Sequence, residues 1–367
     1  MLEIGEIPIW FGAQLLNQKI TAPFSFEVDD YGLIRMGNGD IAQKMIDNYQ
    51  SKSYHFITSP PGYSPWGNEL AMKSVQGLLD TFGDLKNKKI LEIGGGTSWV
   101  AEVLITQLGA SHVTVIDPAL PENKDVHPNI DLISEYLTED TKLSEKYDLI
   151  ISFNTIEHVP EPIDFLRLLR KFMSDDCFLY LKLPESSESL NAGDWGICVH
   201  EHLTYFSKES MTVALEVAGF KPVAWSNYRG AIQVLSGLDS PASSKIAAGS
   251  NDLLEAFSLK SAINLENLKK QVNSYKKLGF YGASVGLCNV AHLAHNFFPD
   301  APDIFDSDVA KVGRFIPGCA DPIKDSSELK GHDLDAICIV PFNFSSVINN
   351  QLKLINRGIG RFDLTRG

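Results

Sequence analysis

The chain has 367 residues, of which 44% are hydrophobic, and this length predicts two domains and a terminal arm rather than one core. Its formal net charge of −14 opposes the displacement of counterions, which disfavours DNA or RNA as a partner. No apolar run approaches the roughly 18–20 residues that span a bilayer. The first residues, Met1-Leu-Glu-Ile-Gly-Glu, lack the basic start and apolar stretch of a signal peptide. We therefore expect a cytoplasmic protein without a membrane partner.

The first 65 residues mix short apolar stretches with Gly, Pro and aromatic residues, and we expect them to be irregular. A helix is predicted from about Glu69 to Phe82, and alternating strands and helices follow. The strands are predicted at residues 89–93, 112–117, 147–153 and 177–183, and the helices at 99–108 and 163–172. Continuous apolar strands between amphipathic helices indicate an α/β fold, a parallel sheet covered on both faces.

The composition shifts to Gly, Ser, Ala and Pro around Ser236–Ser250, which we interpret as a linker. Beyond it, residues 253–278 predict a long helix. A second, smaller α/β unit follows, with a strand and glycine turn at 279–286 and further strands at 303–306 and 336–340. The predicted divisions are therefore residues 1–66 (arm or cap), 67–238 (main domain) and 239–367 (C-terminal domain).

Cysteine spacing favours neither a disulfide framework nor a structural zinc site. None of the five cysteines lies in a C-x-x-C pair, and we expect scattered buried thiols at Cys177, Cys198, Cys288, Cys319 and Cys338.

The most specific local pattern is a glycine turn after the first strand of the main domain, Glu92-Ile-Gly94-Gly95-Gly96-Thr-Ser98. Glycines there let a ligand approach the backbone closely, and Asp117 at the end of the next strand can bind ribose hydroxyls. A dinucleotide motif needs a glycine at Trp99 or Val100, so that pattern fails. Glu92 instead suits the sulfonium and ammonium of S-adenosylmethionine. The sequence predicts this cofactor.

Further segments carry a family resemblance. Asn154-Thr-Ile-Glu-His158-Val-Pro-Glu-Pro resembles the fourth-strand motif of class I S-adenosylmethionine-dependent methyltransferases, whose Rossmann-like sheet is then the expected fold. Asn154 and His158 also match the N-x-x-x-H of the sugar C-methyltransferases, which act on nucleotide-linked keto-deoxysugars. Val199-His200-Glu201-His202-Leu-Thr-Tyr205-Phe-Ser resembles their Y-H-E-H-L-x-Y-F-S string. The resemblance covers roughly residues 67–348 and assigns Asn154 to the cofactor.

The chain departs from that family in two places. Members usually open with a cysteine-rich zinc module, whereas no cysteine precedes Cys177 here. The tyrosine that usually precedes H-E-H is Val199, which can change the acceptor or the reaction. An O- or N-methyltransferase acting on a polysaccharide precursor or another metabolite, and a degenerate cofactor-binding partner protein without turnover, therefore stay open beside a C-methyltransferase.

Carbon methylation beside a ketone needs a base to remove the α-proton and donors to stabilise the enolate. We predict His202 as the base, Glu201 as the group that orients it, and His158 and Tyr205 as donors to acceptor oxygens. A metal on His200 and His202 is disfavoured because no third ligand is near in sequence.

The resemblance further implies a small-molecule acceptor, a nucleotide sugar, held in part by the C-terminal domain. The residues predicted to bind it are Tyr63, His200, Lys311 and Arg314. A homodimer is left open.

Overall fold

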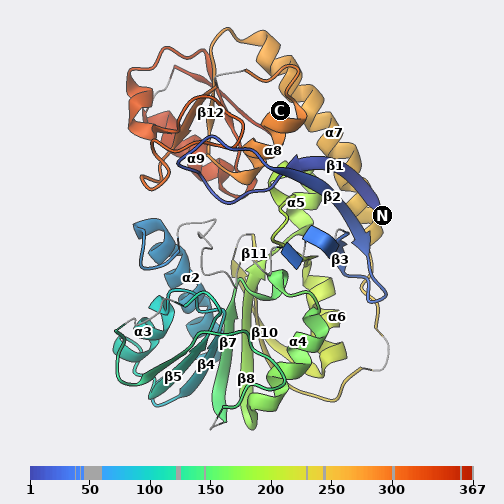
Figure 1. The fold of residues 1–367 in the computed structure, drawn as a ribbon, viewed down its shortest axis with the longest axis vertical. Helices are drawn as coiled ribbons and strands as arrows, with labels where there is room; N and C mark the ends of the chain where they lie inside the picture. The colour runs from blue at the N-terminus through green and yellow to red at the C-terminus, as the bar shows by residue number, and fades with distance from the viewer. Residues whose placement is uncertain are drawn as a thin grey trace.

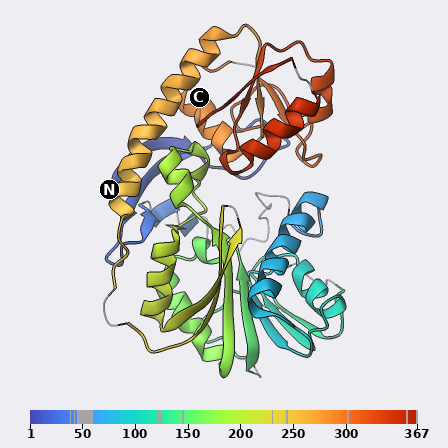
Figure 2. The ribbon, with the colours of Figure 1, turned by 180° about the vertical axis from the view of Figure 1, so that it is seen from behind.

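The structure is a computed structural model that describes residues 1–37, 39–41, 43–44, 60–120, 125–143, 146–228, 230–242, 245–299, 302–355 and 358–365. In these residues the chain forms two lobes, one around each of two large sheets (Figure 1). A long helix and the N-terminal strands run along one side of the molecule, as the opposite view also shows (Figure 2).

The first lobe is built on a seven-stranded sheet with the order β10-β11-β8-β7-β4-β5-β6. Strand β11 runs opposite to the other six. The strands predicted in this region are confirmed with small changes at their ends. The predicted strands are β4 Lys89–Ile93, β5 His112–Ile116, β7 Tyr147–Phe153 and β8 Met173–Pro184. The sheet also contains β6 Ile130–Ile133, β10 Phe220–Tyr228 and β11 Ala231–Leu238.

Helices cover both faces of this sheet, because its apolar strands have to be buried on both sides. One buried cluster lies under α4 and α6 and the other under α2 and α3. The helices are α2 Pro65–Phe82, α3 Trp99–Thr106, α4 Pro162–Leu169 and α6 Lys208–Ala218. Two short 3-10 segments are η1 Ile156–His158 and η2 Arg170–Phe172, and η2 continues the helix predicted at 163–172.

The second lobe has a five-stranded sheet with the order β14-β13-β12-β15-β16, in which all neighbouring strands are parallel. The strands are β12 Leu278–Tyr281, β13 Asp303–Asp306, β14 Lys324–Asp325, β15 Ala336–Ile339 and β16 Gly360–Asp363. The helical segments are α7 Ser250–Ser274, α8 Val285–Leu293, α9 Ser345–Ile355, η4 Ser326–Lys330 and η5 Phe342–Phe344. The long helix ends at Ser274, earlier than predicted, because Leu278 already belongs to β12.

The prediction of an irregular N-terminus is wrong for three segments. Strands β1 Leu2–Pro8, β2 Thr21–Val28 and β3 Ile34–Met36 form an antiparallel sheet, and its last member is β9 Thr204–Tyr205. The pairing of β3 with β9 joins residues about 170 positions apart, which local patterns do not reveal. The stretch 45–59 lies outside the described residues.

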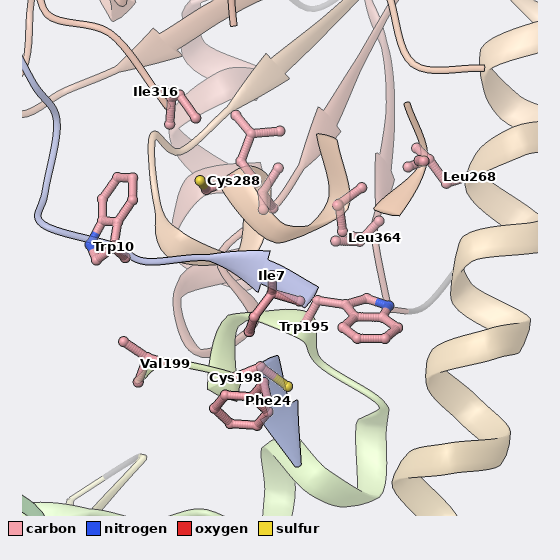
Figure 3. Close-up of a cluster of buried hydrophobic side chains, with 14 of the residues drawn as sticks. Ile7, Trp10, Phe24, Trp195, Cys198, Val199, Leu268, Cys288, Ile316 and Leu364 are labelled. Carbon is pink, nitrogen blue, oxygen red and sulfur yellow. The ribbon is translucent and has the colours of Figure 1, made fainter. Parts of the chain in front are cut away.

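A large apolar cluster joins the N-terminal strands to the second lobe (Figure 3). Ile7 and Phe24 come from β1 and β2, and Trp195 comes from η3 Trp195–Ile197. Cys288 on α8 and Leu268 on α7 complete it from the other side. Residues 187–205, which include α5 Ser187–Ala192, thus pack against α7 and α8 although they follow β8 in the chain.

All five cysteines are buried and free, as the sequence predicts. Among the described helices, none is long and apolar enough to cross a membrane.

Candidate active site

The glycine turn between β4 and α3 leaves no room for side chains. Gly94 has φ 80°, and a Cβ placed there would lie 1.9 Å from Oγ1 of Thr155. A Cβ on Gly95 would lie 2.4 Å from Val115. Ser98, where the family pattern has glycine, also adopts a left-handed backbone with φ 55°. The turn is therefore a bare backbone cradle at the carboxyl end of β4.

Asp117 faces this turn. Its carboxylate accepts hydrogen bonds from the backbone N–H of Gly96 at 2.9 Å and of Ala119 at 2.7 Å. Beside it lies a hollow of about 620 Å³ lined by Pro118, Ser134 and other residues up to 142. The carboxylate of Asp117 is thus held against the backbone of the glycine turn.

Glu92 lies beneath the same turn and is 3% exposed. Burial, followed by the charge of Asp117, raises its pKa to about 8. In the part of the chain that the structure describes, its Oε2 has no hydrogen-bond partner. A buried acidic oxygen without a partner beside a bare backbone cradle fits the cationic end of S-adenosylmethionine.

The carboxyl ends of strands β7 and β8 place polar groups next to this crevice. Asn154, a non-glycine residue with φ 52°, directly follows strand β7, and its neighbour Thr155 contacts the glycine turn. The Oδ1 of Asn154 accepts a hydrogen bond of 2.6 Å from Nζ of Lys182 on β8. Asn154 therefore connects the cofactor crevice to the half-buried Lys182.

His158 and His202 face one another in this region, with ring centroids 5.0 Å apart. Nδ1 of His158 donates to the carbonyl of Glu201 at 2.8 Å, so its Nε2 is the acceptor nitrogen of the neutral ring. Burial lowers the pKa of His158 to about 4 and that of His202 well below its usual range. Both imidazoles are therefore neutral near pH 7 and can accept a proton or a ligand.

Glu157 lies beside this pair and is 2% exposed. Neither oxygen of its carboxylate makes a hydrogen bond within the described residues, and Oε1 lies 3.9 Å from Nε2 of His158. Its backbone carbonyl accepts from Leu203 N at 2.7 Å, which joins η1 to the H-E-H segment. Burial raises the pKa of Glu157 to about 8, while Lys182 acts in the opposite direction. Ligand atoms of Glu157, His158 and His202 lie within 4.8 Å of one another, so this group could also hold a metal ion.

Two predicted residues point elsewhere. The hydroxyl of Tyr205 donates to the carbonyl of Val199 at 2.9 Å, and the side chain is 1% exposed. Its only proton is already used, which corrects its prediction as a donor to the acceptor. The ring of His200 lies against Phe24 of β2, with centroids 5.3 Å apart, and is also 1% exposed. His200 and His202 thus lie in different surroundings, although only Glu201 stands between them in the chain.

The remaining predicted substrate residues are spread over both lobes. Tyr63 is 73% exposed in a loop whose Pro61 carbonyl accepts from Thr97 of the glycine turn at 2.8 Å. Lys311 donates to Asp306 and to the carbonyl of Ala283, both at 3.1 Å. Arg314 is half-buried three residues further on.

Lys182 is a site residue to which sequence reasoning assigned no role. It stands between Leu181 and Leu183 in an apolar strand, and a charge inside such a strand is the signal that could have identified it. Glu157 lies inside the N-x-x-x-H motif, to which the sequence assigns no role at this position, and only the structure shows that its side chain is buried.

The comparisons with known proteins divide the chain in two. Residues 67–224 match the family model described as "Methyltransferase domain", and residues 255–364 match the one described as "C-methyltransferase C-terminal domain". A curated relative, the C-methyltransferase NovU of Streptomyces niveus, is 21% identical over 241 residues. The alignment covers 58% of this chain and only 56% of that relative, so the chain spans about half its length.

Solved structures with similar chains are methyltransferases at low identity. One from Listeria monocytogenes, described as a putative S-adenosylmethionine-dependent methyltransferase, is 11% identical with a TM-score of 0.39, covering 46% of this chain and all of the other. A Burkholderia thailandensis N1-methyltransferase is 13% identical with a TM-score of 0.39, covering 59% of this chain and all of the other.

The Rossmann-like sheet, the glycine turn and the matched residues 67–224 identify the first lobe as a methyltransferase domain. The chain is also similar to C-methyltransferases, because its second lobe matches the model of their C-terminal domain.

Proposed function

We propose that this protein transfers a methyl group from S-adenosylmethionine to a carbon of a nucleotide-linked keto-deoxysugar. One observation carries the proposal: two neutral histidines, His158 and His202, face each other beside the glycine turn. A general base has to be unprotonated before it can take the α-proton, and both imidazoles meet that condition near pH 7. The match to a C-methyltransferase C-terminal domain supports carbon as the acceptor atom.

In this proposal the turn at Gly94–Gly96 admits the cofactor, Asp117 binds its ribose hydroxyls and Glu92 faces its cationic end. When bound, the cofactor supplies a methyl group already activated on a sulfonium. The chain then has to orient the acceptor, exclude water and move one proton. Thr97, tied to the loop that carries Tyr63, holds that loop over the turn.

His202 takes the proton from the acceptor carbon. His158 cannot turn freely, because Nδ1 is bound to the Glu201 carbonyl, and it directs Nε2 toward the same space. Glu201 thus acts through its backbone on the histidine pair, rather than only through its carboxylate as the sequence suggests. With O- or N-methylation, the same histidine would deprotonate a hydroxyl or an ammonium.

The second lobe is proposed to hold the nucleotide part of the acceptor. α8, at the carboxyl end of β12, packs on η3, and η3 leads directly into the H-E-H segment. A Cβ on Gly286 would lie 3.2 Å from Gly196, so the two elements are in close contact. Lys311 is already paired with Asp306, which leaves Arg314 as the stronger candidate for a phosphate.

The test is methylation of a panel of nucleoside-diphosphate 4-keto-6-deoxyhexoses, read by mass spectrometry. His202→Gln should lower turnover by at least 100-fold, because general base catalysis contributes about 10²–10⁴-fold. Its affinity for S-adenosylmethionine should stay within threefold. His295→Ala, at an exposed position of the second lobe, is the matched control and should retain turnover.

Unchanged turnover in His202→Gln would contradict the base assignment. Products whose new methyl is lost on ether cleavage would favour O-methylation. Cofactor binding without any product over the whole panel would favour the partner protein without turnover.

A further inference from the structure

Beyond the histidine pair, we infer that Lys182 is a catalytic residue whose ammonium donates to the acceptor oxygen that becomes negative as the α-proton leaves. This inference rests on the proposed function and adds to it the group that stabilises the enolate. Nothing in the matched motifs points to Lys182; its position does.

Lys182 lies near the carboxyl end of β8, at the same sheet edge as the glycine turn. In the sheet it pairs with Phe153, the last residue of β7, and its Nζ reaches across to Asn154 at 2.6 Å. Thr155 next to Asn154 contacts the turn at Gly94. The ammonium is thereby held between the cofactor crevice and the histidines.

The surroundings of Lys182 leave part of its donor capacity unused. Burial lowers the pKa of Lys182, and the carboxylate of Glu157 opposes that shift. An ammonium has three donors, and the bond to Asn154 uses one of them. Lys182 in turn lowers the pKa of His202, as expected of a cation close to the proposed base.

Other groups near the histidines are poorer donors. Tyr205 has already donated its hydroxyl proton to Val199, and His158 has donated its Nδ1–H to Glu201. A neutral His158 then offers only a lone pair. Lys182 is therefore the described residue here with both positive charge and free donor capacity.

The proposed step is balanced as follows. His202 removes the α-proton of the ketone, and the electrons of that C–H bond form a C=C bond. The carbonyl π electrons move onto oxygen, which accepts a hydrogen bond from the Lys182 ammonium. The enolate carbon is then the nucleophile. Removing a donor of this kind commonly costs about 10²–10³-fold in rate.

The experiment follows enolisation separately from methyl transfer. Protein saturated with S-adenosylhomocysteine, which has no methyl to give, is incubated in D₂O with the keto-deoxyhexose nucleotide that the wild type methylates best, and loss of the α-proton is followed by NMR. Lys182→Met should slow exchange at least 100-fold, whereas Lys182→Arg should restore part of it because the cation and its donors return. Lys221→Met, at an exposed position on β10, is the matched control and should exchange like the wild type.

Affinity for S-adenosylhomocysteine separates chemistry from structure. Lys182→Met should bind it within threefold of the wild type, and its KM for the acceptor should change much less than its kcat. Exchange at the wild-type rate in Lys182→Met overturns the inference and leaves the proposed function standing. Equal loss of cofactor binding and exchange in both Lys182→Met and Lys182→Arg assigns Lys182 a structural role and overturns it too. A wild type that methylates none of the panel overturns the proposed function, and the role of Lys182 with it.

Discussion

Left-handed backbone at two non-glycine residues marks the cofactor crevice. Ser98 has φ 55° just before α3, and Asn154 has φ 52° just after β7. Such conformations are unfavourable for residues with a Cβ and persist where the surroundings require them. The backbone of Asn154 donates to the carbonyl of Lys182 at 2.7 Å while its side chain accepts from the same residue. Strain at Asn154 is thus offset by two bonds to one partner, which positions the ammonium.

Glu92 makes the stability of the protein depend on pH. Its pKa in the folded state is about 8, above the ordinary value of 4.5, because the carboxyl is buried and lies near Asp117. Between these two values the folded state holds a proton that the unfolded state has lost. This contribution to stability is full below about pH 4.5 and disappears as pH rises toward 8.

We therefore expect Glu92→Gln to flatten the fall in unfolding free energy between pH 5 and pH 8. Each unit of pKa shift corresponds to about 1.4 kcal/mol, so the change should be about 2–4 kcal/mol. Urea denaturation at a series of pH values measures it. Glu69→Gln, at an exposed position on α2, should leave the pH profile unchanged. A Glu92→Gln profile parallel to that of the wild type would show that Glu92 does not hold its proton.

At the scale of elements, the short strand β9 determines where the histidines lie. Its two residues pair with β3, and Arg35 of β3 donates to the carbonyls of Leu203 and Pro160 on either side of the H-E-H and N-x-x-x-H segments. The N-terminal sheet thereby contacts the residues that follow both histidine motifs.

Phe26 on β2 is the packing centre of that sheet. Its ring meets Tyr205 of β9 at 5.0 Å and Phe257 of α7 at 5.6 Å, and it is fully buried. Phe26→Ala should lower the free energy of unfolding by about 3–5 kcal/mol, because it leaves a cavity between three elements. Chemical denaturation measures this change. Val223→Ala, at a half-exposed site on β10, should cost well under 1 kcal/mol, and a similarly small cost for Phe26→Ala would contradict the assigned role.

The sequence predicted the elements whose pattern is local. Strands β4, β5 and β7 are apolar runs that end in a glycine turn, a carboxylate or an N-x-x-x-H motif, so both their positions and their ligand ends could be read. The N-terminal sheet could not be predicted in this way, because β3 gains its second partner, β9, only when residues 204–205 come near. Its alternating strand β2 was the available signal.

At the scale of the molecule, the two sheets direct their functional ends toward each other. Gly286 at the start of α8 contacts Gly196 on one side, and the β10–β11 turn at Gly230 approaches Asn343 on another. Trp66 of α2 meets Phe344 at 5.5 Å. Contacts between the lobes at these separate places favour an acceptor that spans both, as a sugar joined to a nucleotide does.

The sequence could predict those site residues that belong to a recognisable motif. It could not predict those whose surroundings are formed by residues distant in the chain. Asp117 contacts the glycine turn at Gly96, and Thr155, three residues before His158, contacts it at Gly94. The capture of the Tyr205 hydroxyl, the separate surroundings of His200 and the cation at Lys182 depend on residues 6 to about 180 positions away.

Calorimetric titration with S-adenosylhomocysteine tests the cofactor crevice most directly, using two glycines with the same backbone strain. Gly94 and Gly249 have φ of 80° and 81°, but a Cβ would collide with Thr155 at the first and meet nothing within 4 Å at the second. The account predicts one binding site in the wild type and in Gly249→Ala, and binding at least 100-fold weaker in Gly94→Ala. Wild-type affinity in a folded Gly94→Ala protein, or no binding by the wild type, would contradict it.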